Sequence, residues 1–371
     1  MKTGRIWKNS AWTQRDLLKV LFWMRNRNTI FFLMSSTMWR RGGQKLKLLY
    51  DITENVKFIV TGSSSLELTG ATSKYLVGRM FSFYLFPFNL GEFLKARDER
   101  LWRIYKKRNE LVNNFISKGE NFTVESDIFL KDFENLLEEF ITFGGYPEVI
   151  KTRDEETKRV IIKNIYETYI GREIIELLKI HDVFKFRRLT TLLSSQLGGM
   201  INYNELASLC NSYYKEILGL LEVLEETFVI RNIRPFYRNL RTELRKNPKV
   251  YFVDPGLRNY VINNFNELEK RVDAGALVEN FALNQLSHLT EKVNYWRTLG
   301  KAEVDFILNV GGEVIPVEVK YATFKKPAIS KSFRSFISAY NPGRALIITK
   351  DYWGEIKLEK TLIKFIPACY M

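Results

Sequence analysis

The sequence has 371 residues, 46% of them hydrophobic and 27% charged, a composition typical of a globular protein with two or three domains. No apolar run approaches the roughly 18 residues that cross a bilayer, so we expect a cytoplasmic protein without a membrane partner. Two cysteines and two histidines exclude a usual zinc cluster, a disulfide framework and most catalysis that depends on histidine.

The formal net charge of +15 is typical of a protein that binds nucleic acid. Its distribution weakens that interpretation, because residues 1–50 contain eleven lysines and arginines and a single acid, Asp16. The remaining residues are nearly balanced in charge. Most of the basic excess therefore belongs to the N-terminus.

Two apolar runs near the N-terminus predict buried strands, at residues 29–33 and 56–60. The second is rich in β-branched residues and leads into the polar segment 61–65, as a buried parallel strand does when it ends in a loop. Between residues 95 and 200 the pattern is mostly helical with mixed charge, which we interpret as helices with a solvated face.

A helix-turn-helix pattern follows. Residues 201–209 predict a short capped helix, residues 214–226 a second helix, and residues 228–233 a wing strand. Five basic side chains beyond that strand could contact DNA phosphates: Arg238, Arg241, Arg245, Lys246 and Lys249. The second helix does not begin with basic residues, so a winged helix that only packs between domains is the alternative to one that binds DNA.

Charged and apolar residues alternate along two C-terminal segments, 303–306 and 316–320. A period of two predicts strands with one buried face, and a Gly-Gly pair between the segments suits a tight turn. Adjacent strands would bring Asp305, Glu318 and Lys320 together at one edge of a sheet. Two carboxylates can hold Mg²⁺, and a lysine beside them can stabilise charge on a phosphate.

These residue types predict phosphodiester hydrolysis, with Asp305 and Glu318 as the metal ligands. The alternative is that they form the solvated face of a strand. The surrounding pattern resembles the restriction-endonuclease-like (PD-(D/E)xK) fold, because a helix, three strands, a helix and a strand follow in order over about residues 270–370. That resemblance implies three acidic residues and a catalytic lysine: Glu279, Asp305, Glu318 and Lys320.

Further motifs run through the chain. They are a strand before Thr61-Gly62-Ser63-Ser64, then Gly78-Arg79, Gly91-Glu92-Phe93, Gly144-Gly145-Tyr146-Pro147, Asp254-Pro255-Gly256-Leu257 and Tyr295-Trp296-Arg297. From about residue 44 to the end, the sequence is similar to a family of prokaryotic AAA-type predicted ATPases. In that family a nucleotide-binding core precedes a helical region, a winged helix and a restriction-endonuclease-like domain of unknown role.

The resemblance implies ATP binding. Thr61 or Ser63 would lie near the γ-phosphate, and Arg79 would supply positive charge to a phosphate, in cis or from a neighbouring subunit. Without the resemblance, these residues would be interpreted as a plain turn and a surface arginine.

The motif G-x-x-x-x-G-K-[ST] occurs nowhere in the chain, and no acidic pair follows the strand at residues 29–33 to hold Mg²⁺. Back-translated and read in the neighbouring frame, residues 34–42 give an acidic stretch typical of a Walker B segment. We therefore hypothesise a local frameshift or sequencing error there, which resequencing the gene would test. Even corrected, the sequence would begin after the Walker A loop, so we expect no ATP hydrolysis by this chain alone.

The sequence thus predicts an α/β chain with a helical middle. We expect a truncated AAA-type (P-loop NTPase) region at residues 1–95, a helical region at 96–198, a winged helix at 199–262 and a restriction-endonuclease-like α/β domain at 263–371. The expected function is that of an ATPase-family protein whose nuclease-like domain acts on nucleic acid with Mg²⁺, with DNA, another protein or a second copy as partner. The alternative is a non-catalytic DNA- or protein-binding remnant of the ATPase.

Overall fold

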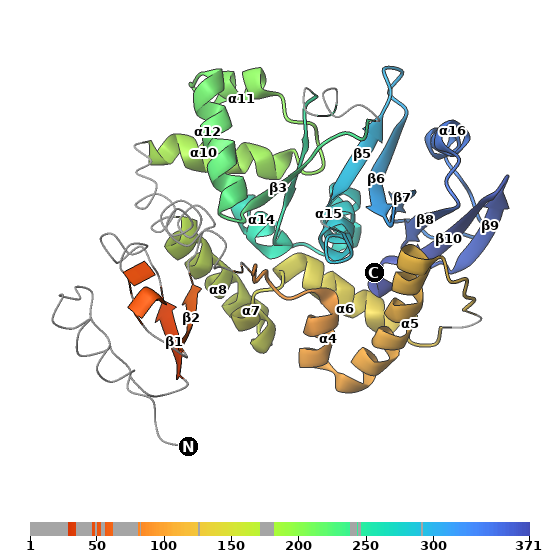
Figure 1. Cartoon of the computed structure of the whole chain (residues 1–371), viewed down its shortest axis with the longest axis horizontal. Helices are drawn as coiled ribbons and strands as arrows, with labels where there is room; N and C mark the ends of the chain where they lie inside the picture. The colour runs from red at the N-terminus through yellow and green to blue at the C-terminus, as the bar shows by residue number, and fades with distance from the viewer. Residues whose placement is uncertain are drawn as a thin grey trace. The chain divides into compact units, whose positions relative to one another are not determined.

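The computed structural model describes residues 29–34, 47–48, 50–52, 56–61, 81, 83–124, 127–170, 182–237, 243, 246–290 and 292–371. The chain divides into two compact units (Figure 1). The first comprises Met1–Leu85 with Glu226–Phe228, and the second comprises Phe86–Glu225 with Val229–Met371. The division therefore falls after residue 85, whereas the sequence suggested a boundary after residue 95.

The first unit contains a pair of parallel strands, β1 (Thr29–Met34) and β2 (Val56–Thr61). Thr29 lies opposite Val56, and Met34 lies opposite Thr61. Both strands coincide with the two predicted apolar runs, and the parallel pairing expected of the second run is confirmed.

The second unit begins with helices, as predicted. The helix α4 (Leu90–Arg97) starts at a capping box, in which Asn89 and Glu92 each accept the other's backbone amide at 2.9 Å. Asp98 ends α4 and caps α5 by accepting two amides of its first turn. The helices that follow α4 are α5 (Glu99–Lys118), α6 (Leu130–Phe143), α7 (Pro147–Lys151) and α8 (Glu155–Thr168). Among the described residues, no helix has the length and apolar character needed to cross a membrane.

The described part of the middle of the chain contains helices followed by a hairpin. The helices α10 (Val183–Ser195), α11 (Tyr203–Leu209) and α12 (Tyr214–Glu226) precede the strands β3 (Ile230–Ile233) and β4 (Lys249–Phe252). The two strands pair antiparallel. The two predicted helices and the predicted strand are therefore present at the expected places.

The Gly-Gly-Tyr-Pro and Asp-Pro-Gly-Leu motifs contact each other in the core of the second unit. Gly144 has a φ of +82°, and a Cβ at this position would collide with the Asp254 carboxylate. Asp254 accepts the Gly145 amide at 2.7 Å and caps α14 (Pro255–Val261). A Cβ on Gly256 would likewise collide with the backbone of the first motif. The glycines of both motifs therefore allow two backbone segments to approach each other closely.

The C-terminal part is a six-stranded mixed sheet in the order β5-β6-β7-β8-β10-β9 (Figure 1). Its strands are β5 (Val293–Arg297), β6 (Glu303–Val310), β7 (Glu313–Lys320), β8 (Arg344–Thr349), β9 (Gly354–Leu358) and β10 (Thr361–Pro367). The pairs β5–β6 and β6–β7 are antiparallel, whereas β8 pairs in parallel with β7 and with β10. The predicted Gly-Gly turn joins β6 to β7, with both glycines at positive φ as a two-residue hairpin favours.

Two helices pack on this sheet with different apolar clusters. The helix α15 (Ala274–Leu286) joins the main core together with Phe306 and Val317, whereas α16 (Lys331–Tyr340) packs with Trp296 and Ile347 in a separate cluster. The predicted order of helix, three strands, helix and strand is confirmed by α15, β5, β6, β7, α16 and β8. The last two strands were not predicted.

Short 3-10 helices complete the second unit, at Leu268–Lys270 and Ala368–Tyr370. The second of these tethers the end of the sheet to the helical part, because the Tyr105 hydroxyl of α5 donates to the Met371 carbonyl at 2.6 Å. The helices and the sheet therefore share one core.

The Asn280 side chain of α15 binds the backbone of β4, and we expect its removal to lower the stability of the protein. Its fully buried side chain accepts the Phe252 amide at 2.7 Å and donates to the Phe252 carbonyl at 2.9 Å. We expect Asn280→Ala to lower the free energy of unfolding by about 1–3 kcal/mol, because the buried Phe252 amide loses its partner while the Phe252 carbonyl keeps the Asn284 side chain as a donor. Urea denaturation measures this loss. Asn309→Ala, at an exposed position of β6, is the matched control, and equal losses in the two variants would contradict the prediction.

Candidate functional site

Asp305 lies in a bulge of β6. The register with β5 shifts so that two residues, Asp305 and Phe306, lie opposite Tyr295 alone. The Asp305 carboxylate accepts the Val319 amide of β7 at 2.7 Å. The bulge thus turns Asp305 out of the regular alternation of the strand and holds it against β7.

Glu318 and Lys320 leave the same face of β7, as the period of two predicted. Lys320 Nζ lies 3.1 Å from Glu318 Oε1, and the Ser330 hydroxyl donates to Glu318 Oε2 at 3.0 Å. Glu318 is buried, whereas the side chain of Lys320 is 48% exposed. Glu318 therefore pairs with a lysine whose side chain is half exposed.

Glu279 approaches from α15, the helix in the main core. The Tyr251 hydroxyl donates to Glu279 Oε1, and Lys249 Nζ lies 3.3 Å from the same oxygen. Lys249 and Tyr251 sit two residues apart on β4, so both side chains leave the same face of that strand.

Lys249 also reaches Glu303, the first residue of β6. Its Nζ lies 2.7 Å from Glu303 Oε1, while Arg297 binds Glu303 Oε2 at 2.7 Å. Five residues are joined by these contacts, and Asp305 and Lys320 are near enough for their charges to interact with Glu279, with Glu318 paired to Lys320. We call these eight residues together the charged cluster: Lys249, Tyr251, Glu279, Arg297, Glu303, Asp305, Glu318 and Lys320. The four predicted site residues are thus all in it, joined by four that sequence reasoning did not assign to the site.

The predicted phosphate contact of Lys249 is wrong. Its side chain is 4% exposed and faces carboxylates, because β4 lies inside the core rather than in the basic loop before it. Lys246 is exposed and remains a candidate, whereas Arg238, Arg241 and Arg245 lie outside the described residues. The sequence Lys-Val-Tyr-Phe carried the missed signal, because its period of two places Lys249 and Tyr251 on one face.

Burial and neighbouring charges shift the pKa of the Asp305 carboxyl at the bulge. Burial and the charge of Glu279 raise the pKa of Asp305 to about 7, against the opposing fields of Lys249 and Lys320. For Lys249, burial lowers the pKa, but three surrounding carboxylates outweigh burial and raise it above its ordinary value. Lys249 therefore stays charged, while Asp305 exchanges its proton near neutral pH.

The fit of these residues to Mg²⁺ is uneven. Within the described part of the chain, no three His, Cys, Asp or Glu side chains are arranged to hold a metal ion. Mg²⁺ needs only one or two carboxylates besides water, and Asp305 and Glu279 each keep one oxygen without a hydrogen bond to described residues. Both oxygens of Glu318 are already bound, by Lys320 and Ser330. Asp305 and Glu279 therefore suit the ion better than Glu318 does.

The predicted nucleotide-binding residues belong to the first unit. Thr61 is the last residue of β2. Ser63, Arg79 and the segment 35–42 lie outside the described residues.

Comparisons with known proteins match three segments of the chain. Residues 9–94 match an AAA domain, residues 134–268 a domain of unknown function (DUF8612), and residues 274–369 another domain of unknown function (DUF4143). The first match supports an ATPase-like region with a P-loop-type fold. The third spans α15 through β10, so the charged cluster takes Lys249 and Tyr251 from one matched segment and its other members from another.

The relatives found are uncharacterized proteins. One of Haemophilus influenzae is 22% identical over 339 residues, covering 90% of this chain and 76% of that protein. One of Mycobacterium tuberculosis is 25% identical over 318 residues, covering 84% of this chain and 62% of that protein. One of Methanocaldococcus jannaschii is 25% identical over 304 residues, covering 79% and 61% respectively. The chain is thus shorter than each of these relatives. No solved structure gives a significant match.

The raised pKa of Asp305 predicts a pH-dependent gain from Asp305→Asn. Because the folded-state pKa of about 7 exceeds the ordinary aspartate value of 3.8, the folded protein binds the proton more tightly than the unfolded chain does. Raising the pH through this window destabilises the wild-type protein but not the variant. We expect Asp305→Asn to be more stable by up to about 4 kcal/mol at pH 8, with the gain vanishing towards pH 4.

Urea denaturation in EDTA between pH 4.5 and 8 measures this difference. Glu359→Gln, at an exposed turn, is the matched control and should show no such trend. A difference between Asp305→Asn and wild type that stays constant over the whole pH range would contradict the prediction.

Proposed function

We propose that this chain is an ATPase-family protein whose C-terminal part is a restriction-endonuclease-like domain acting on phosphodiester bonds of nucleic acid. The observation that carries the proposal is that Glu279, Asp305 and Lys320 lie close enough for their charges to act on one another, while Lys320 pairs with Glu318. Their order along the chain, an acid on a helix, an aspartate and then Glu-x-Lys, is that of the fold.

Each residue has a distinct part in this proposal. Bound Mg²⁺ would supply Lewis acidity at a phosphate. Asp305 and Glu279 offer the oxygens that suit it, and Glu318, the second ligand predicted from the sequence, positions Lys320. The exposed ammonium of Lys320 is placed to contact an oxygen of the scissile phosphate and stabilise its developing charge.

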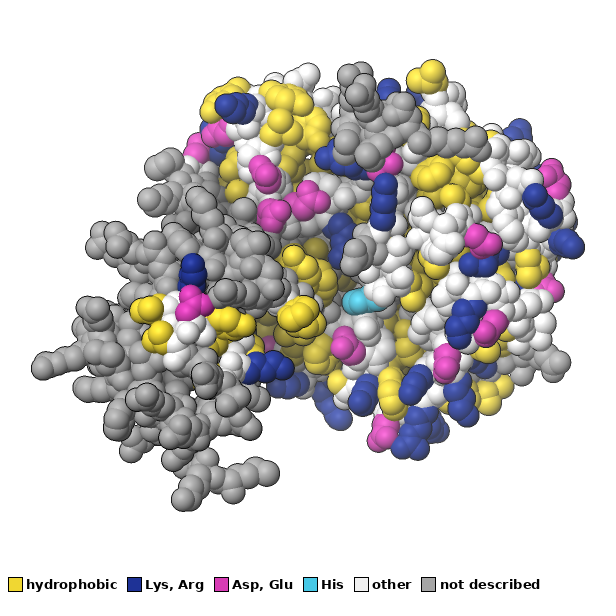
Figure 2. Space-filling model, in the orientation of Figure 1, with side chains coloured by type: hydrophobic (Ala, Val, Ile, Leu, Met, Phe, Trp, Pro, Cys, Tyr) yellow, Lys and Arg dark blue, Asp and Glu magenta, His cyan; other side chains and the backbone are white. Residues whose placement is uncertain are grey.

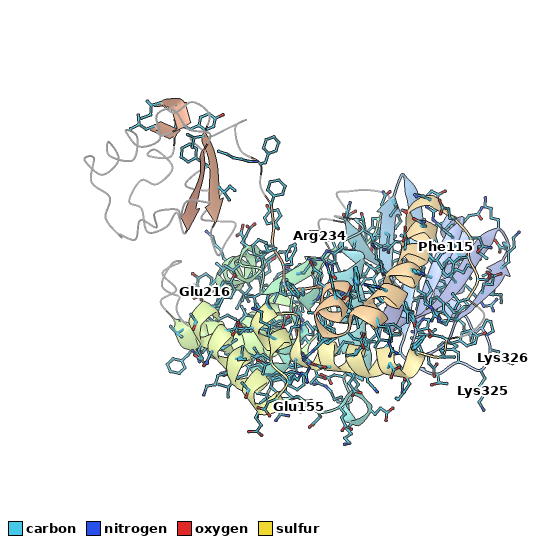
Figure 3. All side chains as sticks on the ribbon, turned by 90° about the horizontal axis from the view of Figure 1, so that it is seen from below. Phe115, Glu155, Glu216, Arg234, Lys325 and Lys326 are labelled. Carbon is cyan, nitrogen blue, oxygen red and sulfur yellow. The ribbon has the colours of Figure 1, made fainter. Side chains whose placement is uncertain are left out.

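Exposed basic residues that follow Lys320 in the chain support nucleic acid as the partner. Lys325 and Lys326 follow β7 in the loop before α16 and project from the surface (Figure 3). Positive side chains of this kind neutralise phosphates without reading sequence. We propose that α11, α12 and the β3–β4 hairpin form a winged helix, with exposed Lys246 at its hairpin as a further phosphate contact.

For the first unit we propose ATP binding, with Thr61, Ser63 and Arg79 near the phosphates. The match of residues 9–94 to an AAA domain supports this assignment. We also propose a cytoplasmic location, in agreement with Cys210 and Cys369, which are both buried free thiols.

A non-catalytic module that binds DNA or protein is the second candidate. Lys249 favours it, because its ammonium already neutralises Glu279 and Glu303. On the face shown in Figure 2, basic and acidic side chains of the second unit are interspersed, which is a weaker electrostatic attraction for nucleic acid than a one-sign surface.

Cleavage of nucleic acid tests the proposal. We expect Mg²⁺- or Mn²⁺-dependent cleavage of labelled DNA or RNA, reduced at least about 100-fold in Lys320→Ala, which loses charge stabilisation, and in Asp305→Asn, which loses a metal oxygen. Single- and double-stranded substrates should be compared by gel electrophoresis.

Lys357→Ala, at an exposed position of β9, is the matched control for Lys320→Ala and should cleave like the wild type. Melting temperatures must show that all variants remain folded. No cleavage by the folded wild-type protein on any substrate would favour the binding module instead.

ATP turnover is a separate prediction. The chain carries no G-x-x-x-x-G-K-[ST] motif, so we expect it to release phosphate from ATP no faster than a blank reaction with Mg²⁺ present. Phosphate release by the purified protein measures this rate. A steady-state rate that scales with protein concentration and falls in Arg79→Ala would contradict the expectation.

A further inference from the structure

Lys249 lies at the centre of the charged cluster on a rigid support. Its ammonium is 2.7 Å from Glu303 and 3.3 Å from Glu279, and the Lys249 side chain is almost completely buried. Its backbone pairs with Ile233 and forms a bridge with Met200, so β4 is held on both sides. Only the flexible side chain is therefore free to rearrange.

The position of this ammonium is one that a metal ion would favour. A buried cation is costly unless carboxylates surround it, and buried carboxylates are costly unless a cation neutralises them. Carboxylate oxygens are also the ligands that Mg²⁺ and Mn²⁺ prefer. The Glu279 carboxylate would therefore attract a divalent ion more strongly if the ammonium were absent.

We propose that Lys249 is a built-in competitor of the divalent cation, whose ammonium must leave Glu279 and Glu303 before a metal ion is held tightly by the charged cluster. This inference rests on the function proposed above, because it concerns the same carboxylates. The inference adds that a residue outside the carboxylate-bearing segment regulates the metal affinity of the site. Lys249 comes from β4, in the segment 134–268, while the carboxylates come from the segment 274–369.

We expect the displacement to leave the backbone in place, because Lys249 is paired with Ile233 and Met200. Rotation about the side-chain bonds of Lys249 would release Glu279 and Glu303, while Arg297 keeps its bond to the other Glu303 oxygen. Tyr251 would keep its hydrogen bond to Glu279. Glu279 would thus stay in place to receive the ion together with Asp305.

Mn²⁺ binding to the full chain tests the proposal without any assay of activity. Lys249→Met keeps the length of the side chain and removes its charge, so we expect Mn²⁺ to bind at least tenfold more tightly than to the wild type. Lys249→Arg keeps the charge and should bind as weakly as the wild type. Loss of the free Mn²⁺ signal in electron paramagnetic resonance measures the affinity.

Two further variants locate the ion. Lys357→Met removes an exposed lysine from the same sheet and should leave Mn²⁺ affinity unchanged. Asp305→Asn added to Lys249→Met should abolish the gain. Equal Mn²⁺ affinity of Lys249→Met and wild type would overturn the proposal, as would a gain that Asp305→Asn leaves intact.

The wild-type protein gives an independent measurement if Lys249→Met does not fold. An amine-reactive acylating reagent followed by mass spectrometry should leave Lys249 unmodified without metal. With Mn²⁺ at saturation, the rate of its modification should rise at least fivefold, while that of Lys357 stays the same. Bound Mn²⁺ with Lys249 still protected would overturn the proposal.

These outcomes separate the inference from the proposed nuclease. Tighter Mn²⁺ binding by Lys249→Met, without cleavage of nucleic acid by any variant, would support the competitor and contradict the nuclease. Metal-dependent cleavage by the wild type, with no gain in Mn²⁺ affinity for Lys249→Met, would support the nuclease and contradict the competitor.

Discussion

The buried contact of Lys249 with Glu279 and Glu303 is the interaction on which the charged cluster depends. It compensates two carboxylates that would otherwise be costly to place beside the core. Asp305 lies beside these paired charges, and its own burial, together with the charge of Glu279, raises its pKa above the ordinary value.

The motifs that run through the chain divide into two kinds. The Gly-Gly-Tyr-Pro and Asp-Pro-Gly-Leu motifs allow two backbone segments to meet around Asp254, and they present no reactive side chain. In the Glu-x-Lys segment of β7, in contrast, a buried carboxylate pairs with a lysine that is half exposed. The first kind builds the core of the second unit, and only the second kind belongs to the candidate site.

Much of the C-terminal part could be predicted from the sequence, because alternation and helical spacing are local signals. The helix with Glu279, the hairpin of β6 and β7 and the strand β8 follow from such patterns. The bulge at Asp305 could not be predicted, since it depends on the register with β5. The place of Lys249 was misjudged because a basic loop precedes it, and loop composition says nothing about where the next strand packs. Both surprises arise from pairing between distant segments.

The clamp of Asn280 on β4 has a consequence for how the protein can be divided experimentally. A fragment that begins with α15 would keep all six strands of the sheet but would lose β4 and with it the partners of the Asn280 side chain. Glu279 and Glu303 would lose their buried cation in the same cut, and the apolar side of α15 would lose part of its cover. We therefore expect a fragment that includes the hairpin of β3 and β4 to be more stable than the segment 274–369 alone.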